Sequence, residues 1–328
     1  MGPADDAAPQ PRIILGRYRI EKTLGRGGMG EVLLAHDELL NRPVALKRLD
    51  PQGDDRDARR RGILREARRA SAISDRRIAS IYDVVDLDDE VVLVMEYVDG
   101  VTLRRRMADP VPIEEFWNLA TQCVEGVAAA HAHGVIHRDI KPENFMVTPA
   151  GQVKVLDFGI AKRADVDGET TTTTGSDSRS GRVAGTPHYM APEAHLGGAV
   201  DERTDIFSLG VVFYELLTSR RPFEGGNYAV VVNQVLNTPP PPVATLNPAV
   251  GWELSRVVDG MLAKNQADRI PSAAELLRRM KSARPRSNAS RAKPRSRRAC
   301  VRRTPSSCST SAPAPTARST TPWSCSTG

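Results

Sequence analysis

The 328-residue sequence contains no uninterrupted apolar run of the roughly 20 residues that cross a bilayer. We therefore predict that this chain has no transmembrane helix. Residues 1–12 also lack the apolar core of a secretory signal peptide. An N-acylation signal that began at Gly2 would need Ser or Thr where Asp6 stands, so we exclude this modification too.

Cysteine is scarce. The four cysteines are Cys123, Cys300, Cys308 and Cys325, and no two of them have the spacing of a metal site. Three of them lie near the C-terminus, outside the part of the chain that we expect to fold. This pattern fits a reducing compartment better than a disulfide framework, so we predict a cytoplasmic protein.

Acidic residues are missing from the C-terminal region. Residues 276–328 carry 13 Lys or Arg and no Asp or Glu, whereas the rest of the chain carries 33 basic and 40 acidic residues. Residues 283–328 are rich in Ser, Thr, Pro and Arg, so we predict a disordered tail. The alternative is an arm for nucleic acid or anionic membranes, but Trp323 alone makes no stacking array. We expect no specific nucleic acid partner.

Apolar periodicity divides the remaining chain into a β-rich and an α-rich half. In the first half we predict one helix and five short strands, at 56–73 and at 18–20, 31–36, 44–47, 81–85 and 91–96. In the second half we predict helices at 113–134, 205–218, 253–263 and 272–280. The helix at 205–218 is apolar on nearly every side, which is typical of a buried helix.

These elements predict an α+β fold with two lobes. We place a disordered leader at 1–13, a β-rich N-lobe at 14–98, a mainly helical C-lobe at 99–282 and the tail at 283–328. A cleft between two such lobes is a common place for a ligand.

A glycine loop, Gly25-Arg26-Gly27-Gly28-Met29-Gly30, follows the first strand and has the form G-x-G-x-x-G-x-V up to Val32. Glycines let backbone amides approach phosphate oxygens. A tight glycine turn without a ligand is the plain alternative. A dinucleotide-binding fold would need a helix directly after the loop, but a strand follows here.

Lys47 ends the strand 44–47 shortly after this loop, where its ammonium group could neutralise the phosphates of a nucleotide. Glu66 is its candidate anionic partner, because Glu66 lies on the same helix face as Ile63 and Ala70. A surface ion pair with Arg69 is the alternative for Glu66.

The string His137-Arg138-Asp139-Ile140-Lys141-Pro142-Glu143-Asn144 is the most specific motif in the chain. The carboxylate of Asp139 could align an attacking hydroxyl and accept its proton, and Lys141 could offset charge on a transferred phosphoryl group. The amide oxygen of Asn144 could bind Mg²⁺. After the strand-like segment 153–156, Asp157-Phe158-Gly159 could bring a second metal ligand, Asp157.

Two further segments should support this site. Glu193 ends the run 185–193, Asp205 opens the buried helix, and Arg269 lies near the end of the C-lobe. A buried charge is costly unless it is paired. We therefore predict a pair of Glu193 with Arg269, and hydrogen bonds between Asp205 and the backbone of the loop that contains Asp139.

Residues 14–282 resemble the catalytic domain of protein kinases, with each diagnostic motif in order. The segments MEYVDGVTL, HAHGVIHRDIKPEN, DFGIAK and GTPHYMAPE are similar to those of bacterial eukaryotic-like serine/threonine kinases, especially the actinobacterial receptor kinases. One departure is the segment 74–78, Ser-Asp-Arg-Arg-Ile, where the family usually has a His-Pro pair.

The resemblance implies ATP as the phosphate donor, with Mg²⁺, or Mn²⁺ in its place, as the metal. It implies an ATP site made of Leu24, Gly25, Arg26, Gly27, Gly28, Met29, Gly30, Val32, Ala45, Lys47, Glu96 and Val98. It implies a Lys47–Glu66 ion pair, Asp139 as catalytic base, and Asn144 and Asp157 as metal ligands. Lys141 and Thr186 match positions typical of serine/threonine specificity.

Protein substrates and a homodimer through the N-lobe are also implied. The threonine-rich segment 168–180 indicates autophosphorylation at Thr171, Thr172, Thr173 or Thr174, with Arg138 placed to pair with the phosphate. A pseudokinase would be expected to lose Lys47, Asp139, Asn144 or Asp157, and all four are present. A small-molecule kinase is disfavoured by the intact segment 185–193.

Overall fold

The computed structural model describes residues 12–27, 30–50, 56–87, 90–158 and 187–285. The chain divides into two units, Met1–Pro285 and Arg286–Gly328, and the second lies wholly outside the described residues. Within the described ranges, no helix is both long and apolar enough to span a bilayer.

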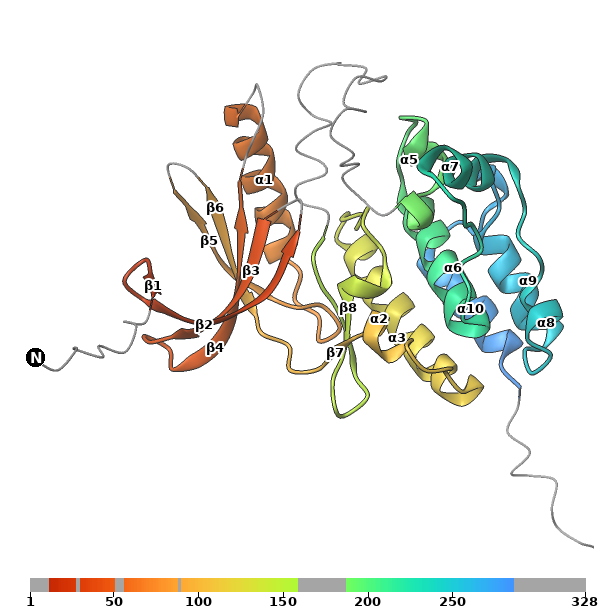
Figure 1. Cartoon of the computed structure of the whole chain (residues 1–328), viewed down its shortest axis with the longest axis horizontal. Helices are drawn as coiled ribbons and strands as arrows, with labels where there is room; N and C mark the ends of the chain where they lie inside the picture. The colour runs from red at the N-terminus through yellow and green to blue at the C-terminus, as the bar shows by residue number, and fades with distance from the viewer. Residues whose placement is uncertain (1–11, 28–29, 51–55, 88–89, 159–186, 286–328) are drawn as a thin grey trace, which may run out of the picture. The chain divides into compact units, whose positions relative to one another are not determined.

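The N-terminal half is a six-stranded antiparallel sheet with the strand order β1-β2-β3-β4-β6-β5 and one helix, α1 (Figure 1). Its elements are β1 (Ile13–Ile14), β2 (Tyr18–Gly27), β3 (Gly30–Asp37), β4 (Arg42–Leu49), α1 (Arg56–Ser71), β5 (Ile81–Asp86) and β6 (Val91–Glu96). The sheet therefore contains all five predicted strands, and the α+β prediction is confirmed.

Both faces of the central strands are buried, because side chains alternate between them. On β4, Val44 and Leu46 face a small core with Tyr18 and Leu33, while Ala45 and Leu49 belong to the main core. Helix α1 adds Ile63, Ala67 and Ala70 to this main core. Glu66 is only 9% exposed and lies among the buried residues of the same helix.

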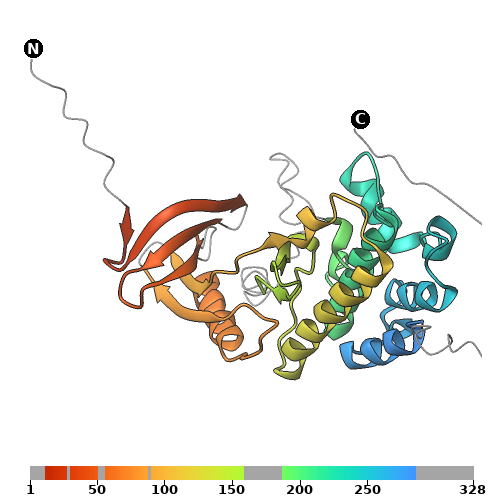
Figure 2. The ribbon, with the colours of Figure 1, turned by 90° about the horizontal axis from the view of Figure 1, so that it is seen from below.

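The C-terminal half begins with a small sheet of β7 (Val101–Thr102), β8 (Phe145–Val147) and β9 (Val153–Val155). Its helices are α2 (Leu103–Arg106), α3 (Ile113–Ala132), α5 (Pro192–His195), α6 (Glu202–Thr218), α7 (Tyr228–Asn237), α8 (Val243–Leu246), α9 (Trp252–Met261) and α10 (Ala273–Ala283). Three 3-10 turns join them, η1 (Pro142–Asn144), η2 (Pro187–Tyr189) and η3 (Gln266–Asp268). Figure 2 shows α3 alongside α10, and these two helices pack against each other.

Helix α6 is the centre of this half. It is buried continuously from Thr204 to Tyr214 and packs against α3, α8 and α9. The side chain of Asp201 caps its start by accepting a hydrogen bond from the backbone N–H of Arg203. The helix therefore begins at Glu202, three residues before the predicted start at Asp205.

Candidate active site

The loop after α3 is fixed by one buried carboxylate of α6. Asp205 is fully buried, and its two oxygens accept hydrogen bonds from the backbone N–H groups of His137 (2.7 Å) and Arg138 (2.9 Å). His131 Nε2 lies 2.8 Å from the same carboxylate. Arg138 has a φ of 64°, which is unusual for a residue other than glycine. The predicted contact between Asp205 and this loop is therefore confirmed.

Asp139 lies within hydrogen-bonding distance of two side chains from its own loop. Lys141 Nζ donates to Asp139 Oδ2 at 2.8 Å, and Asn144 Nδ2 donates to the same oxygen at 3.0 Å. Asn144 Nδ2 also donates to the backbone oxygen of Asp139 at 2.7 Å. Because its nitrogen is used in this way, Asn144 can offer its amide oxygen to a cation.

His137 is buried and contacts backbone groups of the loop and of the segment after β9, and none of its contacts with described residues suggests proton transfer. Its Nε2–H donates to the backbone oxygen of Leu156 at 2.8 Å, and its Nδ1 accepts from the N–H of Asp139 at 3.3 Å. Phe158 packs against the ring at a centroid distance of 4.9 Å. Burial lowers the pKa of His137, so the ring is neutral at physiological pH.

Asp157 lies two residues after the end of β9 and beside Lys47 of β4. Lys47 Nζ is 2.9 Å from Asp157 Oδ1, and the φ of Asp157 is 48°. The N–H of Leu156 donates to the backbone oxygen of Asn144 at 2.8 Å, which joins this strand end to η1. A carboxylate and an amide oxygen are the ligands that Mg²⁺ prefers, so Asp157 and Asn144 fit a magnesium site.

The expected ion pair between Lys47 and Glu66 is not found among the described residues. Glu66 instead accepts a hydrogen bond from Arg69 of the same helix at 2.8 Å, and Arg65 Nε lies 3.9 Å away. Arg69 lies one helical turn from Glu66 on α1. The ammonium group of Lys47 pairs with the carboxylate of Asp157 instead. Each of the two predicted residues thus has another partner.

The glycine loop joins β2 to β3 as a hairpin, with Gly25 opposite Val32 and Gly27 opposite Gly30. Gly30 has a φ of 128°, and a Cβ atom there would lie 1.8 Å from the backbone oxygen of Arg48. No residue with a side chain fits this position without a backbone shift. The strand after the loop excludes the dinucleotide-binding alternative.

The residues expected to surround an adenine ring lie on β4 and at the end of β6. Ala45 is buried and stands opposite Met95 in the sheet, and Val98 is buried just beyond β6. The carboxylate of Glu96 is held by Lys154 at 2.8 Å and by the N–H of Ser80 at 3.2 Å. Leu24, on β2, is 43% exposed.

The unusual turn after α1 is stabilised by its own polar residues. Asp75 Oδ1 accepts from the N–H of Arg77 at 2.8 Å, and Arg77 Nη2 pairs with Glu125 of α3 at 2.6 Å. The N–H of Val155 donates to the oxygen of Arg77 at 2.7 Å. Gly126 makes room for this approach, because a Cβ there would lie 2.6 Å from Val155.

The predicted pair of Glu193 and Arg269 is confirmed and is bidentate. Arg269 Nη1 donates to Glu193 Oε1 at 2.8 Å, and Nη2 donates to Oε2 at 3.0 Å. Thr204 adds a hydrogen bond to Oε1 at 2.7 Å. Burial alone would raise the pKa of Glu193, but the hydrogen bonds from Arg269 and Thr204 lower it overall.

Several predicted positions lie outside the described residues. They are Gly28, Met29, Gly159, Thr186 and the phosphorylation candidates Thr171, Thr172, Thr173 and Thr174. Their roles stay predictions, as do the domain boundaries.

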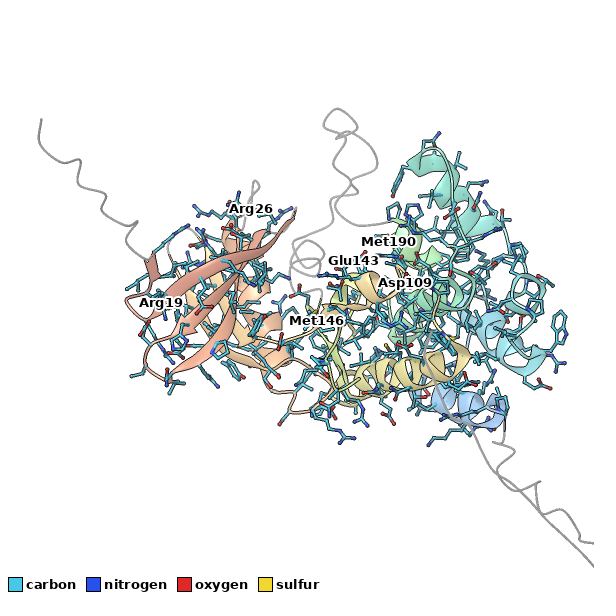
Figure 3. The ribbon with its side chains drawn as sticks, turned by 60° about the horizontal axis from the view of Figure 1, so that its bottom comes forward. Arg19, Arg26, Asp109, Glu143, Met146 and Met190 are labelled. Carbon is cyan, nitrogen blue, oxygen red and sulfur yellow. The ribbon has the colours of Figure 1, made fainter. Side chains whose placement is uncertain are left out.

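Sequence reasoning missed a polar network beside the catalytic loop. Arg104 of α2 donates to Glu143 at 2.8 Å and to Glu215 of α6 at 2.8 Å, and it contacts the hydroxyl of Tyr189. Figure 3 labels Glu143 and Met190, the residue after Tyr189, in the same part of the helical half. The motif that contains Glu143 was the only signal that pointed to this place.

The site has the arrangement that is typical of the protein kinase fold: a glycine hairpin, a strand lysine, a loop with Asp139, Lys141 and Asn144, and an aspartate shortly after a strand. Residues 18–280 match the protein kinase domain family, so the chain belongs to this family.

Several curated proteins are similar to this chain. Serine/threonine-protein kinase PrkC of Bacillus subtilis is 37% identical over 274 residues, which cover 82% of this chain and 41% of PrkC. Serine/threonine-protein kinase PknB of Mycobacterium leprae is 37% identical, with 81% and 43% covered. The chain thus spans about two fifths of the length of these relatives.

The crystal structure of the kinase domain of Mycobacterium tuberculosis PknI, determined as a point mutant, has a similar fold. Its TM-score is 0.63 and its identity 26%, and the match covers 83% of this chain and 97% of that domain. The resemblance to bacterial serine/threonine kinases is confirmed.

Proposed function

We propose that this chain is an ATP-Mg²⁺-dependent serine/threonine protein kinase in bacterial signalling. The observation that carries this proposal is the position of Asp139, whose carboxylate is held by Lys141 and Asn144 on a loop that Asp205 anchors in the core. The chain keeps each charged group that phosphoryl transfer requires, which argues against a pseudokinase.

In the proposed reaction, the carboxylate of Asp139 orients a substrate hydroxyl and accepts its proton as the oxygen attacks the γ-phosphorus of ATP. The bond from this phosphorus to the bridging oxygen breaks, and ADP leaves with the electron pair. Lys141 Nζ, 2.8 Å from Asp139, is placed to offset the negative charge of the transferred group. A bound Mg²⁺, held by Asn144 and Asp157, would neutralise phosphate charge.

The test is phosphate incorporation from ATP into a generic protein substrate, with wild type beside Asp139→Asn. We expect the substitution to lower the rate at least about 100-fold, since a general base contributes at least that much. Asp109→Asn, at an exposed aspartate, is the matched control and should keep the wild-type rate. Incorporation that survives Asp139→Asn would refute the role of this residue, and phosphoamino acid analysis tests the serine/threonine preference.

Autophosphorylation is a separate part of the proposal. The support is the run Thr171–Thr174 in the sequence and the position of Arg138 directly before Asp139. Phosphopeptide mapping of active protein, with the Asp139→Asn variant as control, should find phosphate within 168–180. An unmodified segment in fully active protein would overturn this part alone.

Protein substrates, a cytoplasmic location and an N-lobe homodimer complete the proposal. The turn between β3 and β4 supports the dimer, because Leu39 is 71% and Leu40 52% exposed there. Sedimentation of wild type and of Leu39→Ser should distinguish a dimer from a monomer. The only described cysteine, Cys123, is buried and free, in keeping with a reducing compartment.

A further inference from the structure

Arg104 of α2 lies between two carboxylates beside the catalytic loop. Its Nε donates to Glu143 Oε1 at 2.8 Å, and its Nη1 donates to Glu215 Oε1 at 2.8 Å. Its Nη2 contacts the hydroxyl of Tyr189, which in turn donates to Glu215 Oε2 at 2.5 Å. One guanidinium group therefore satisfies acceptors from η1, η2 and α6 together.

The charges of this cluster balance. Glu215 also has Arg221 Nε at 3.6 Å, so two carboxylates face two guanidinium groups. Burial alone would lower the pKa of Arg104, but the hydrogen bonds to Glu215 and Glu143 raise it. Burial, together with Glu215, raises the pKa of Tyr189, so the phenol stays neutral. Without Arg104, the site would carry two carboxylates and one cation, Arg221, at 3.6 Å from Glu215.

The cluster lies within reach of a substrate whose hydroxyl meets Asp139. Glu143 directly precedes Asn144, whose side chain touches Asp139. An extended chain advances about 3.3 Å per residue, so the reach of a peptide allows residues a few positions from the hydroxyl to meet the cluster. The outer part of the cluster is open to solvent, with exposed side-chain fractions of 44% for Glu143 and 30% for Arg104.

We propose that Arg104 is a specificity-determining residue that fills an acidic subsite for the substrate. The guanidinium of the protein occupies the position that a substrate arginine would otherwise take between Glu143 and Glu215. The kinase is therefore indifferent to, or disfavours, a basic residue at that substrate position. The inference rests on the proposed kinase function. The competing interpretation is a purely structural network that joins α2 to α6.

The test compares peptides that carry one serine acceptor with neutral flanks and a single arginine moved through each flanking position in turn. The measured quantity is the ratio of kcat/KM between each arginine peptide and the neutral parent peptide. This ratio is independent of the fraction of enzyme that is folded, so partial destabilisation of a variant does not affect it. Wild type should give a ratio near or below one at the position that Arg104 affects.

Arg104→Met should raise the ratio about tenfold or more at one position, which corresponds to about 1.4 kcal/mol. Arg104→Lys, which keeps the positive charge, should restore ratios close to those of wild type. Arg105→Met removes an exposed charge from the same helix and should leave the profile unchanged. Arg104→Met combined with Glu215→Gln should lose the gained preference, because the main carboxylate is gone.

The proposal is overturned if Arg104→Met gives the same ratios as wild type at all positions, or if the double variant keeps a gained preference. It is also overturned if wild type already selects arginine at the affected position. Failure of the kinase function itself would appear as no phosphate transfer by wild type to any peptide. The two failures are therefore distinguishable in the same experiment.

Discussion

Replacing Arg269 by methionine removes the guanidinium that holds Glu193 and the ends of two segments of the helical half. The side chain of Arg269 is fully buried, and that of Glu193 is 11% exposed. Besides its two bonds to Glu193, Arg269 donates to the backbone oxygens of Arg203 at 2.8 Å and of Ala263 at 3.1 Å. The substitution leaves a buried carboxylate without its main counter-charge.

Breaking a buried ion pair from one side costs about 3–5 kcal/mol. In a domain of this size, each kcal/mol lowers Tm by about 2–4 °C. We therefore expect Arg269→Met to lower Tm by about 6–20 °C. Replacing both partners, as Glu193→Leu with Arg269→Met, should recover part of this loss, because no lone charge then stays buried.

Differential scanning fluorimetry or calorimetry measures this effect. Arg279→Met is the matched control, because Arg279 pairs with Glu275 on the surface, where its side chain is 46% exposed. Such a pair contributes about 0–1 kcal/mol, so Tm should change by only a few degrees. A fall of less than about 2 °C for Arg269→Met would refute the assignment of a large stabilising role to this pair.

The same pair predicts a pH dependence. The hydrogen bonds from Arg269 and Thr204 hold the folded pKa of Glu193 below 4.5, against the effect of burial. A carboxyl group with a lowered folded pKa stabilises the fold above its unfolded pKa, and this contribution is lost as pH falls through the folded pKa. The Tm difference between wild type and Glu193→Gln should therefore narrow as the pH falls below about 4.5.

Three further substitutions test other parts of the structure. Gly30→Ala should lower the free energy of unfolding, measured by denaturant unfolding, by about 1–3 kcal/mol. The φ of Gly30 is 128°, and a Cβ atom there would lie 1.8 Å from the backbone oxygen of Arg48. Arg77→Ala should lower Tm by about 2–4 °C, with no further loss when Glu125→Gln is added to it. Arg17 lowers the pKa of Asp37 to about 2. The difference in free energy of unfolding between wild type and Asp37→Asn should therefore be constant above pH 3.8 and decrease towards pH 2. An unchanged difference at pH 2 would contradict this last assignment.

Helix α6 and helix α7 show what sequence patterns could and could not predict. The apolar run of α6 predicts a buried helix. Its start was predicted three residues too late, because the first turn contains polar residues and is fixed by the side chain of Asp201, which an apolar pattern does not reveal. Helix α7 was missed, since its Val-Val-Val run fits a strand equally well. Its start depends on Asn227, whose side chain accepts from the N–H of Val230, and on the burial of Val231.

The site shows a similar division. Asp139, Lys141 and Asn144 lie within six residues of one motif, so the sequence predicted that they share a site, although it did not predict the hydrogen bonds between them. The hydrogen-bond partners of Arg104 are separated from it by 39, 85 and 111 positions in the sequence. The adjacent Arg105 and Arg106 give this segment the pattern of a solvent-exposed run of charges. The sequence predicted Glu66 as the partner of Lys47, but Lys47 pairs with Asp157, which lies 110 positions away in the chain and is brought to Lys47 only by the fold.

Because Asp205 binds the backbone of the catalytic loop from the buried helix α6, the loop should unfold at the same temperature as this helix. The strained backbone at Arg138 is held by a carboxylate on the most buried helix, so the loop cannot lose its geometry while α6 stays packed. Activity and the cooperative melting of the helical half should then share one midpoint. A substitution deep in α6, far from any substrate atom, would be recorded in an assay as a catalytic defect.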